Sequence, residues 1–417
     1  MCGNHRNRAL TAPINWRTTV KKANAHSHTQ NTILQAASCV VMLAVAGSSV
    51  AGEGWKLRQS PVGSFGGDIA ALPEPSGPFG SALITYLESY KILDANGNAK
   101  VPDAMSIPLP TGTPTRGALA DGVYTVNVPA GTTNYKQTQA QLNLAGGYWT
   151  DAIYNAGRLQ FAANLPLVKI KRTLSLTQPL GTVSPTTAAS PPLTALPAAL
   201  QGAVAAVTAA VNAKVQAGVA AALVTPTLQN TEASGIGDME LTVNWVRRQE
   251  QLKVLAGVTL FAPTGSYDVA RGPNPGSGNF YTLRPGVTLT FYPGKNDSAT
   301  DPGLTFQGRV SYGLNTTNKD TNYRSGNFLH AEVGAVKVIG KWAFGANVLT
   351  IRQTTDDTGK GAAADGNRYT NNSFGPFLTY KIPGQDNTGL NLHYTNNFGG
   401  SNATASRAVQ LKLIKTW

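Results

Sequence analysis

The sequence predicts an all-β fold, a transmembrane antiparallel up-and-down β-barrel of about 12 strands with one Ala-rich helical loop insertion. Three observations support it: apolar and polar side chains alternate along much of the chain, long and short connections alternate between the segments, and the last residue is the aromatic Trp417. A strand with lipid on one face and a lumen on the other needs only this two-residue period. Strands of water-soluble β-sandwiches also alternate apolar and polar side chains. The features of the two chain ends therefore help to distinguish a membrane barrel from a sandwich.

The N-terminal residues 1–51 are predicted to be a secretory signal. A Lys-Lys pair at 21–22 precedes an apolar run over 33–50, and Ser49-Val50-Ala51 has the small-x-small pattern of a cleavage site. An N-terminal membrane anchor is the alternative, but the run is short and interrupted by serines. We expect a mature chain that begins near Gly52, in the outer membrane of a Gram-negative cell.

Processing would leave little catalytic chemistry. Both cysteines, Cys2 and Cys39, lie in the signal, as do three of the five histidines, so that only His330 and His393 remain. Neither has a second ligand at metal-binding spacing, and no nucleophile elbow or phosphate loop is present. We expect no catalytic residue, no metal and no cofactor, and a protein that is not an enzyme. A barrel phospholipase is the alternative, because catalytic groups need not be adjacent in sequence.

The charge balance is basic but dispersed. The formal charge of +13 falls to +8 without the five cations of residues 1–51, which contain no acid. The remaining Lys and Arg are spread singly, which argues against nucleic acid as a partner. We expect a mild preference for anionic lipid headgroups or solutes. No segment after the signal is expected to be apolar enough for a transmembrane helix.

Twelve strands are expected, an even number that returns both chain ends to the periplasm. They are placed near 80–92, 138–149, 157–172, 235–247, 251–262, 279–292, 303–315, 326–338, 341–354, 369–382, 388–398 and 406–417. Short turns are expected at 247–250, 340 and 383–386, and long loops at 93–137, 173–234, 263–278, 316–325, 355–368 and 399–405. Outer-membrane barrels have long external loops and short periplasmic turns, which predicts the orientation.

Two segments do not fit the barrel pattern within the domain predicted over 78–417. Residues 52–77 are rich in Gly and Pro and are expected to be irregular, either as a plug in the lumen or as a periplasmic tail. The insertion at 174–233 is expected to be extracellular, with a Pro-rich linker followed by valines at helical spacing over 198–224. This helix is interpreted either as a lid that enters the lumen or as a surface helix packed on its own loop.

The polar faces of the strands predict the lumen lining, because a charge that faces lipid costs roughly 2–4 kcal/mol near the bilayer midplane. Strand alternation places the following side chains inside: Arg284, Gln307, Arg309, His330, Glu332, Asn347, Lys381, His393 and Lys412. They form either a selectivity lining with a cationic bias or a filling in which the cations pair with Glu332 and with loop acids such as Asp356. Loop aromatics such as Phe280, Tyr281, Tyr323 and Phe328 either line a route for apolar solutes or belong to the interfacial girdles.

Several motifs resemble one family of outer-membrane proteins. They are the Gly-rich entry and Asp-containing turn within 61–97, Gly235-Ile236-Gly237-Asp238, the segment 261–268, the loop 320–326 followed by His330, and Asp356-Asp357. Together they are similar to the meta-pathway phenol-degradation family over nearly all of the mature chain except 174–233. The resemblance implies a transporter barrel akin to hydrophobic-compound porins, without catalytic residues. It implies no particular substrate and no role for the Ala-rich insertion.

The sequence therefore predicts a monomeric outer-membrane channel for passive uptake of small hydrophobic or aromatic compounds. The alternatives are a porin for small polar or anionic solutes and a structural or adhesive barrel. The expected partners are outer-membrane lipid and lipopolysaccharide, the solute, and the barrel-assembly machinery, which would recognise the C-terminal strand ending at Trp417.

Overall fold

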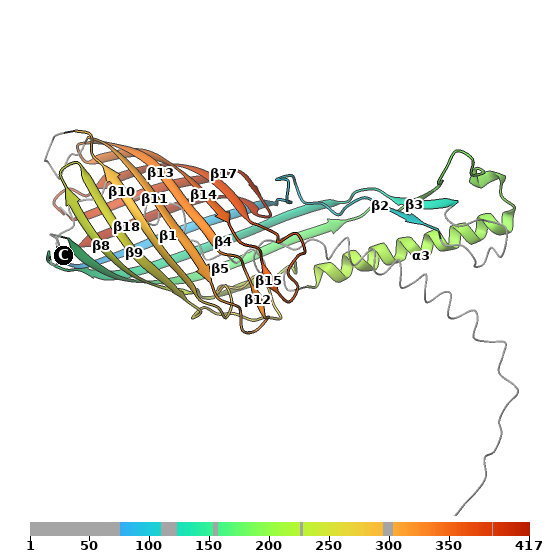
Figure 1. The fold of residues 1–417 in the computed structure, drawn as a ribbon, viewed down its shortest axis with the longest axis horizontal. Helices are drawn as coiled ribbons and strands as arrows, with labels where there is room; N and C mark the ends of the chain where they lie inside the picture. The colour runs from blue at the N-terminus through green and yellow to red at the C-terminus, as the bar shows by residue number, and fades with distance from the viewer. Residues whose placement is uncertain (1–75, 110–122, 153–156, 226–227, 295–302, 386) are drawn as a thin grey trace, which may run out of the picture.

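Twelve long strands close into a barrel, as predicted. The computed structural model describes residues 76–109, 123–152, 157–225, 228–294, 303–385 and 387–417. The barrel strands are β1 (Gly77–Ile92), β4 (Thr132–Trp149), β5 (Arg158–Thr177), β8 (Met239–Gln249), β9 (Leu252–Ala262), β10 (Thr282–Phe291), β11 (Leu304–Asn315), β13 (Phe328–Ile339), β14 (Trp342–Gln353), β16 (Thr370–Lys381), β17 (Thr388–Ser401) and β18 (Thr404–Thr416). The C-terminus lies at one end of the barrel, and an extension projects from the other (Figure 1).

The barrel closes through β1, which pairs antiparallel with both β18 and β4. Leu83 faces Lys412 on one side and Asn143 on the other. Every further neighbour is also antiparallel, and the β4–β5 pairing completes the ring. Closure leaves no unpaired edge, which is what lipid requires because it offers backbone groups no hydrogen bonds. The predicted signal 1–51 and nearly all of the segment 52–77 lie outside the described residues.

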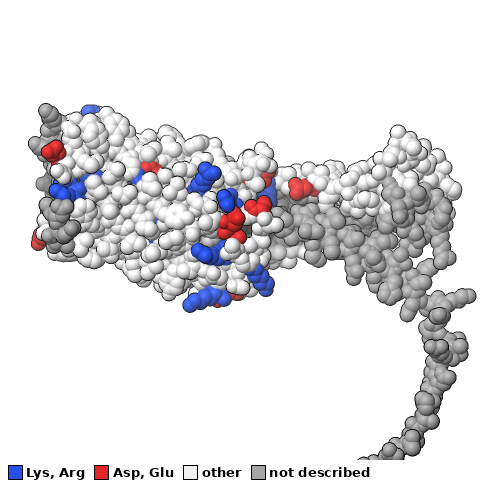
Figure 2. All heavy atoms as spheres, in the orientation of Figure 1, with Lys and Arg blue, Asp and Glu red and all other residues white. Residues whose placement is uncertain are grey.

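The predicted alternation decides which face each side chain takes. In β10 the apolar Leu283, Leu289 and Phe291 are 43–47% exposed on the outside, while Thr282 and Arg284 are at most 5% exposed. The side of the barrel accordingly shows few charges, and charged side chains gather toward the end that carries the extension (Figure 2). The outer wall is therefore apolar and the interior polar, the reverse of a water-soluble protein.

Three sequence predictions need correction. The strand expected at 235–247 is two strands, β7 (Glu232–Ile236) and β8. The break lies opposite Pro166 of the partner strand β5, which has no N–H to donate to the ladder. The carbonyl oxygen of Pro166 accepts a hydrogen bond from Gly237 N–H at 2.7 Å. The connection expected to be long at 399–405 is a turn of two residues, Asn402 and Ala403, with Asn402 at φ 48°. Strands β4 and β5 also extend several residues further from the barrel than predicted.

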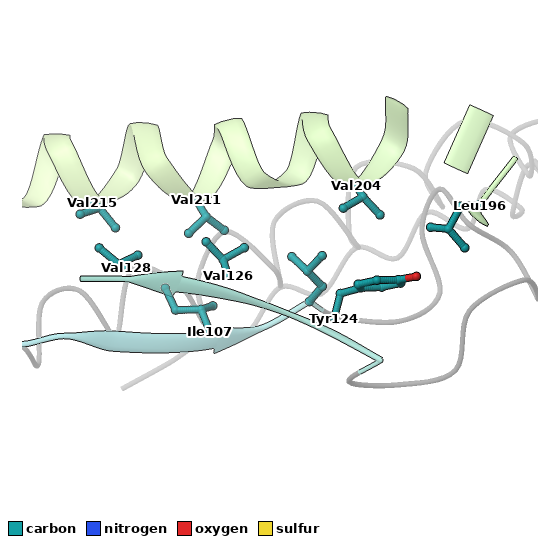
Figure 3. Packing of buried hydrophobic residues seen from close by; sticks show 9 residues of the cluster. Ile107, Tyr124, Val126, Val128, Leu196, Val204, Val211 and Val215 are labelled. Carbon is teal, nitrogen blue, oxygen red and sulfur yellow. The ribbon is translucent and has the colours of Figure 1, made fainter. Parts of the chain in front are cut away.

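The extension is built from two loops that are distant in sequence. Strands β2 (Met105–Pro108) and β3 (Tyr124–Val128) come from the first loop, β6 (Thr182–Pro185), η2 (Leu193–Ala195) and α3 (Ala198–Leu223) come from the second, and the sheet order is β2-β3-β6. The predicted valine face of α3 packs on this sheet (Figure 3). The buried cluster comprises Ile107, Leu109, Tyr124, Val126, Val128, Leu196, Val204, Val211 and Val215. The helix therefore packs on a sheet outside the lumen, but two of the three strands of that sheet come from the other loop and not from its own.

Two further features complete the fold. By length and composition α3 is apolar enough to cross a membrane, contrary to the sequence expectation, but its apolar face is used against the small sheet. Near its C-terminus, Leu223 packs on a cluster of Ile92, Tyr135 and Leu174, which joins the extension to the barrel. Among the loops at this end, β12 (Tyr323–Arg324) pairs with β15 (Thr358–Gly359).

Candidate functional site

Five of the predicted lumen residues form one connected network, which we call the polar belt: Arg309, His330, Glu332, Asn347 and His393. Arg309 Nη2 lies 2.9 Å from Glu332 Oε2 and 3.3 Å from His330 Nε2. Asn347 Nδ2 donates to Glu332 Oε1 at 2.5 Å, and Asn347 Oδ1 lies 3.0 Å from His393 Nε2. All five side chains are nearly inaccessible, at 0–8% exposure. Strand alternation therefore identified side chains that act together.

The polar belt crosses β16 without a side chain from that strand. Asn347 is on β14 and His393 on β17, with β16 between them, and Gly375 of β16 faces Asn347 in the register. A Cβ on Gly375 would lie 2.4 Å from His393 Nε2 and 2.9 Å from Asn347 Oδ1, closer than atoms approach. Glycine at this position is what allows the network to continue across the strand.

The hydrogen-bond pattern indicates the role of Nε2 in each histidine. A guanidinium has only donors, so His330 Nε2 must accept from Arg309, and the proton of a neutral His330 is on Nδ1. Asn347 uses its amide NH₂ toward Glu332, which leaves its oxygen to accept from His393 Nε2–H. The belt is thus a directional chain that ends on a single carboxylate, Glu332.

The other predicted residues lie around the belt at different heights. Arg284 on β10 stacks over the ring of Phe261 with its guanidinium carbon 4.8 Å from the centroid. Gln307 shares β11 with Arg309, and its buried Oε1 has no hydrogen-bond partner among the described residues. Lys412 is buried on β18, whereas Lys381 is half-buried at the end of β16 near the C-terminus. The predicted set is therefore wider than the five residues of the belt.

Sequence reasoning missed the contribution of β4. Gln139, Gln141 and Asn143 form a ladder of side-chain hydrogen bonds at 2.6 and 2.7 Å along the inner face of this strand. The strand itself was predicted over 138–149, and the same alternation that selected the other residues indicates these. Gln160 and Asn244, 2.7 Å apart on β5 and β8, continue the polar lining.

The loop aromatics also required correction. Phe280, Tyr323 and Phe328 are 0–8% exposed and therefore cannot be girdle residues, while Tyr281 is 43% exposed. The ring of Phe328 fills the space over Gly313, where a Cβ would approach it to 2.2 Å. Buried aromatics of this kind fill the interior near the loops instead of facing lipid.

Apolar side chains flank the polar belt on β13 and β14, whereas its buried neighbours on β11 and β17, such as Ser311 and Asn391, are polar. Toward the extension lie Phe328, Leu349 and Ile351, and toward the C-terminus lie Val336, Val338 and Phe377. The Phe377 ring meets His393 edge-on with centroids 5.7 Å apart, so the apolar layer and the belt are in contact. A molecule passing along this wall would meet apolar, polar and again apolar surface.

Two of the motifs that resembled a known family anchor loops. Asp238 in the β7–β8 break accepts backbone N–H groups from Gly265 at 3.1 Å and Ser277 at 2.8 Å. Asp357, 4% exposed, accepts from Gly326 N–H at 2.8 Å and from the side chains of Gln353 and Tyr323. These carboxylates connect neighbouring loops at the end that carries the extension.

The expected pairing of lumen cations with Glu332 and with loop acids is only partly observed. Glu332 pairs with Arg309, as anticipated. Asp356 instead pairs with Arg368 of its own loop, at 2.6 Å. Within the described part of the chain, no group of three His, Cys, Asp or Glu could hold a metal ion.

The apolar outer wall, polar lumen and closed ring of twelve strands define this protein as an outer-membrane β-barrel. The chain belongs to the family described as "Putative MetA-pathway of phenol degradation", whose model matches residues 120–413. This confirms the family resemblance. No curated protein matches the sequence.

Solved structures share the architecture at low identity. The COG4313 outer membrane channel from Pseudomonas putida F1 superposes with a TM-score of 0.54 at 12% identity, over 86% of this chain and 100% of that one. The CymD monoaromatic hydrocarbon channel gives 0.35 at 10% identity, over 84% and 91%. The Ralstonia pickettii toluene transporter TbuX gives 0.35 at 9% identity, over 84% and 93%. The first of these similarities supports the fold.

Proposed function

We propose that this barrel is a channel for the passive uptake of small aromatic compounds that carry a polar group. The observation that carries the proposal is the wall formed by β13 and β14, where the polar belt lies between two apolar layers. An aromatic ring gains from apolar contact, and its hydroxyl or similar group can exchange hydrogen bonds with the belt. The solved outer membrane channel of similar fold supports transport, and the family description, which names phenol degradation, supports an aromatic solute.

The proposal includes an orientation. The extension would lie outside the cell and both termini in the periplasm, because most connections on the extension side are long and most on the terminal side are short. The exceptions are the two-residue β17–β18 turn and the longer β10–β11 connection. The apolar outer wall would contact outer-membrane lipid and lipopolysaccharide. The C-terminal strand β18 would be the segment recognised by the barrel-assembly machinery.

The test is single-channel conductance of the full mature protein refolded into a planar bilayer, together with uptake of phenol into liposomes. The belt side chains are almost inaccessible to water, so we expect small ion conductance and measurable phenol flux. Benzene and glycerol serve as the purely apolar and purely polar comparison solutes. Phenol should pass faster than glycerol.

The other outcomes identify the other functions. Large, steady ion conductance with equal glycerol flux would indicate a porin for polar or anionic solutes, to which Arg284 and Lys412 would give an anion preference. Inserted barrels that pass neither ions nor phenol would indicate a structural or adhesive barrel, in which the extension is the functional part.

A further inference from the structure

Four cations gather on one part of the outer wall, and they are independent of the lumen. Lys136, Lys169, Lys171 and Arg407 lie on the outward face of β4, β5 and β18, with side chains 55–64% exposed. Two acids, Glu88 and Glu232, lie among them, which leaves two positive charges in excess. We call these six residues the outer basic patch.

The contacts show that the patch is continuous across neighbouring strands. Glu88 lies 3.2 Å from Arg407 and 3.5 Å from Lys136, and Glu232 lies 2.8 Å from Lys169 and 4.0 Å from Lys171. Lys136 faces Thr173 and Lys171 faces Thr138, so the two lysines are diagonal neighbours on one face of the β4–β5 pair. Such neighbours lie roughly 7–8 Å apart, a distance that one phosphate group can bridge.

The patch begins where the apolar wall ends. On β1 the outward residues Ile84 and Tyr86 are at least half exposed, and the next outward residue is Glu88; on β5 the outward Leu167 is followed by Lys169 and Lys171. Ion pairs this exposed contribute little to stability, so fold stability does not explain four cations here. The apolar wall matches the acyl chains of a lipid, and the cations next to it, toward the extension, match the phosphate groups of that lipid.

We propose that the outer basic patch binds the phosphate groups of the glycolipid in the outer leaflet, lipopolysaccharide, at a fixed position on the barrel. The proposal rests on the orientation given under Proposed function, since only the cell-surface leaflet carries this lipid, and it does not require that the lumen conducts. The cations would either leave Glu88 and Glu232 to bind phosphate oxygens or contact the carboxylates and the phosphate oxygens together. Two excess charges favour such an anion.

The experiment measures binding of bisphosphorylated lipid A to the full mature protein in detergent by native mass spectrometry, with fully dephosphorylated lipid A as the matched lipid. We expect the phosphorylated lipid to bind more tightly. The variant K136Q/K169Q/K171Q/R407Q should lose roughly fivefold in affinity for each charge removed. Arg352→Gln is the matched control, because Arg352 is an exposed cation of the outer wall on β14, away from the patch.

Three results would overturn the proposal. They are equal affinity for the two forms of lipid A, a loss of affinity in Arg352→Gln equal to the loss per charge in the quadruple variant, and binding of phosphatidylglycerol as tight as that of lipid A. Mobility on unheated gels shows that each variant still forms a barrel. Orientation is tested separately by labelling Ala213→Cys on the exposed face of α3 with an impermeant maleimide in whole cells. Phenol flux through the quadruple variant should equal that of the unmodified protein, which separates this proposal from the channel function.

Discussion

The side chains of Asn347 and His393 hydrogen-bond at 3.0 Å although their strands, β14 and β17, are not neighbours. They meet over Gly375, on the strand between them. Because Asn347 also donates a hydrogen bond to Glu332, this contact links the Arg309–Glu332 pair to His393 on β17. The polar belt is therefore one cooperative unit, in which a change at any member affects the others.

Gly375→Ala should disrupt this unit by sterics alone. The added Cβ would lie within 3 Å of both His393 and Asn347, and overpacking of this kind costs about 1–3 kcal/mol. The free energy of unfolding in urea, followed by tryptophan fluorescence, measures the loss. Gly308→Ala is the control, because a Cβ there meets nothing within 4 Å. Equal stability of the two variants would contradict the role given to Gly375.

Glu332→Gln should destabilise the barrel more strongly. Glu332 is the carboxylate that pairs with Arg309, with side-chain exposures of 3% and 9%, and removing one partner of a buried pair costs about 3–5 kcal/mol. Replacing both residues by apolar ones, as in Arg309→Met with Glu332→Leu, should restore most of that loss. Urea midpoints of the two variants test this, and a double variant as unstable as the single one would show that the pair is not the cause.

The sequence was sufficient to predict the barrel because the pattern that specifies a barrel strand lies within the strand itself. Alternation with a period of two assigns each side chain to a face. All nine predicted lumen residues lie on barrel strands, and all except Gln307 and Lys381 are buried. Turn residues then divide the strands, which is why their number was correct.

What the sequence could not show depends on contacts between distant segments. The sheet that joins β2 and β3 to β6 pairs residues more than 50 positions apart, such as Val126 with Val183, and its strands are too short to show a period. Likewise, nothing in the local sequence around Gly375 indicates that two side chains meet over it. The grouping of the belt residues thus required the register of five strands, β11, β13, β14, β16 and β17.

Asp357→Asn should loosen the loops at the end that carries the extension without affecting the barrel. The carboxylate accepts bonds from Gly326 N–H, Gln353 and Tyr323, and an amide retains one acceptor but presents an NH₂ to donors, at a cost of about 1–3 kcal/mol. Limited proteolysis should then cut within 316–327 or 354–369 more rapidly. Asp356→Asn is the matched control, since Asp356 is half exposed and pairs with Arg368 at the surface. Equal cleavage of the two variants would show that Asp357 does not anchor the loops.

Val215→Asp should unfold the extension while leaving the barrel intact. Val215 is 1% exposed in the core between α3 and the β2–β3–β6 sheet, and a carboxylate buried there without a partner costs at least about 3 kcal/mol. The exposed Ala213, on the opposite face of the same helix, provides the control Ala213→Asp. Protease treatment of the reconstituted protein should remove the extension only from Val215→Asp, while gel mobility before heating shows an intact barrel for both. Loss of the barrel in Val215→Asp would mean that the extension, through Leu223 and its cluster, is needed for the barrel to form.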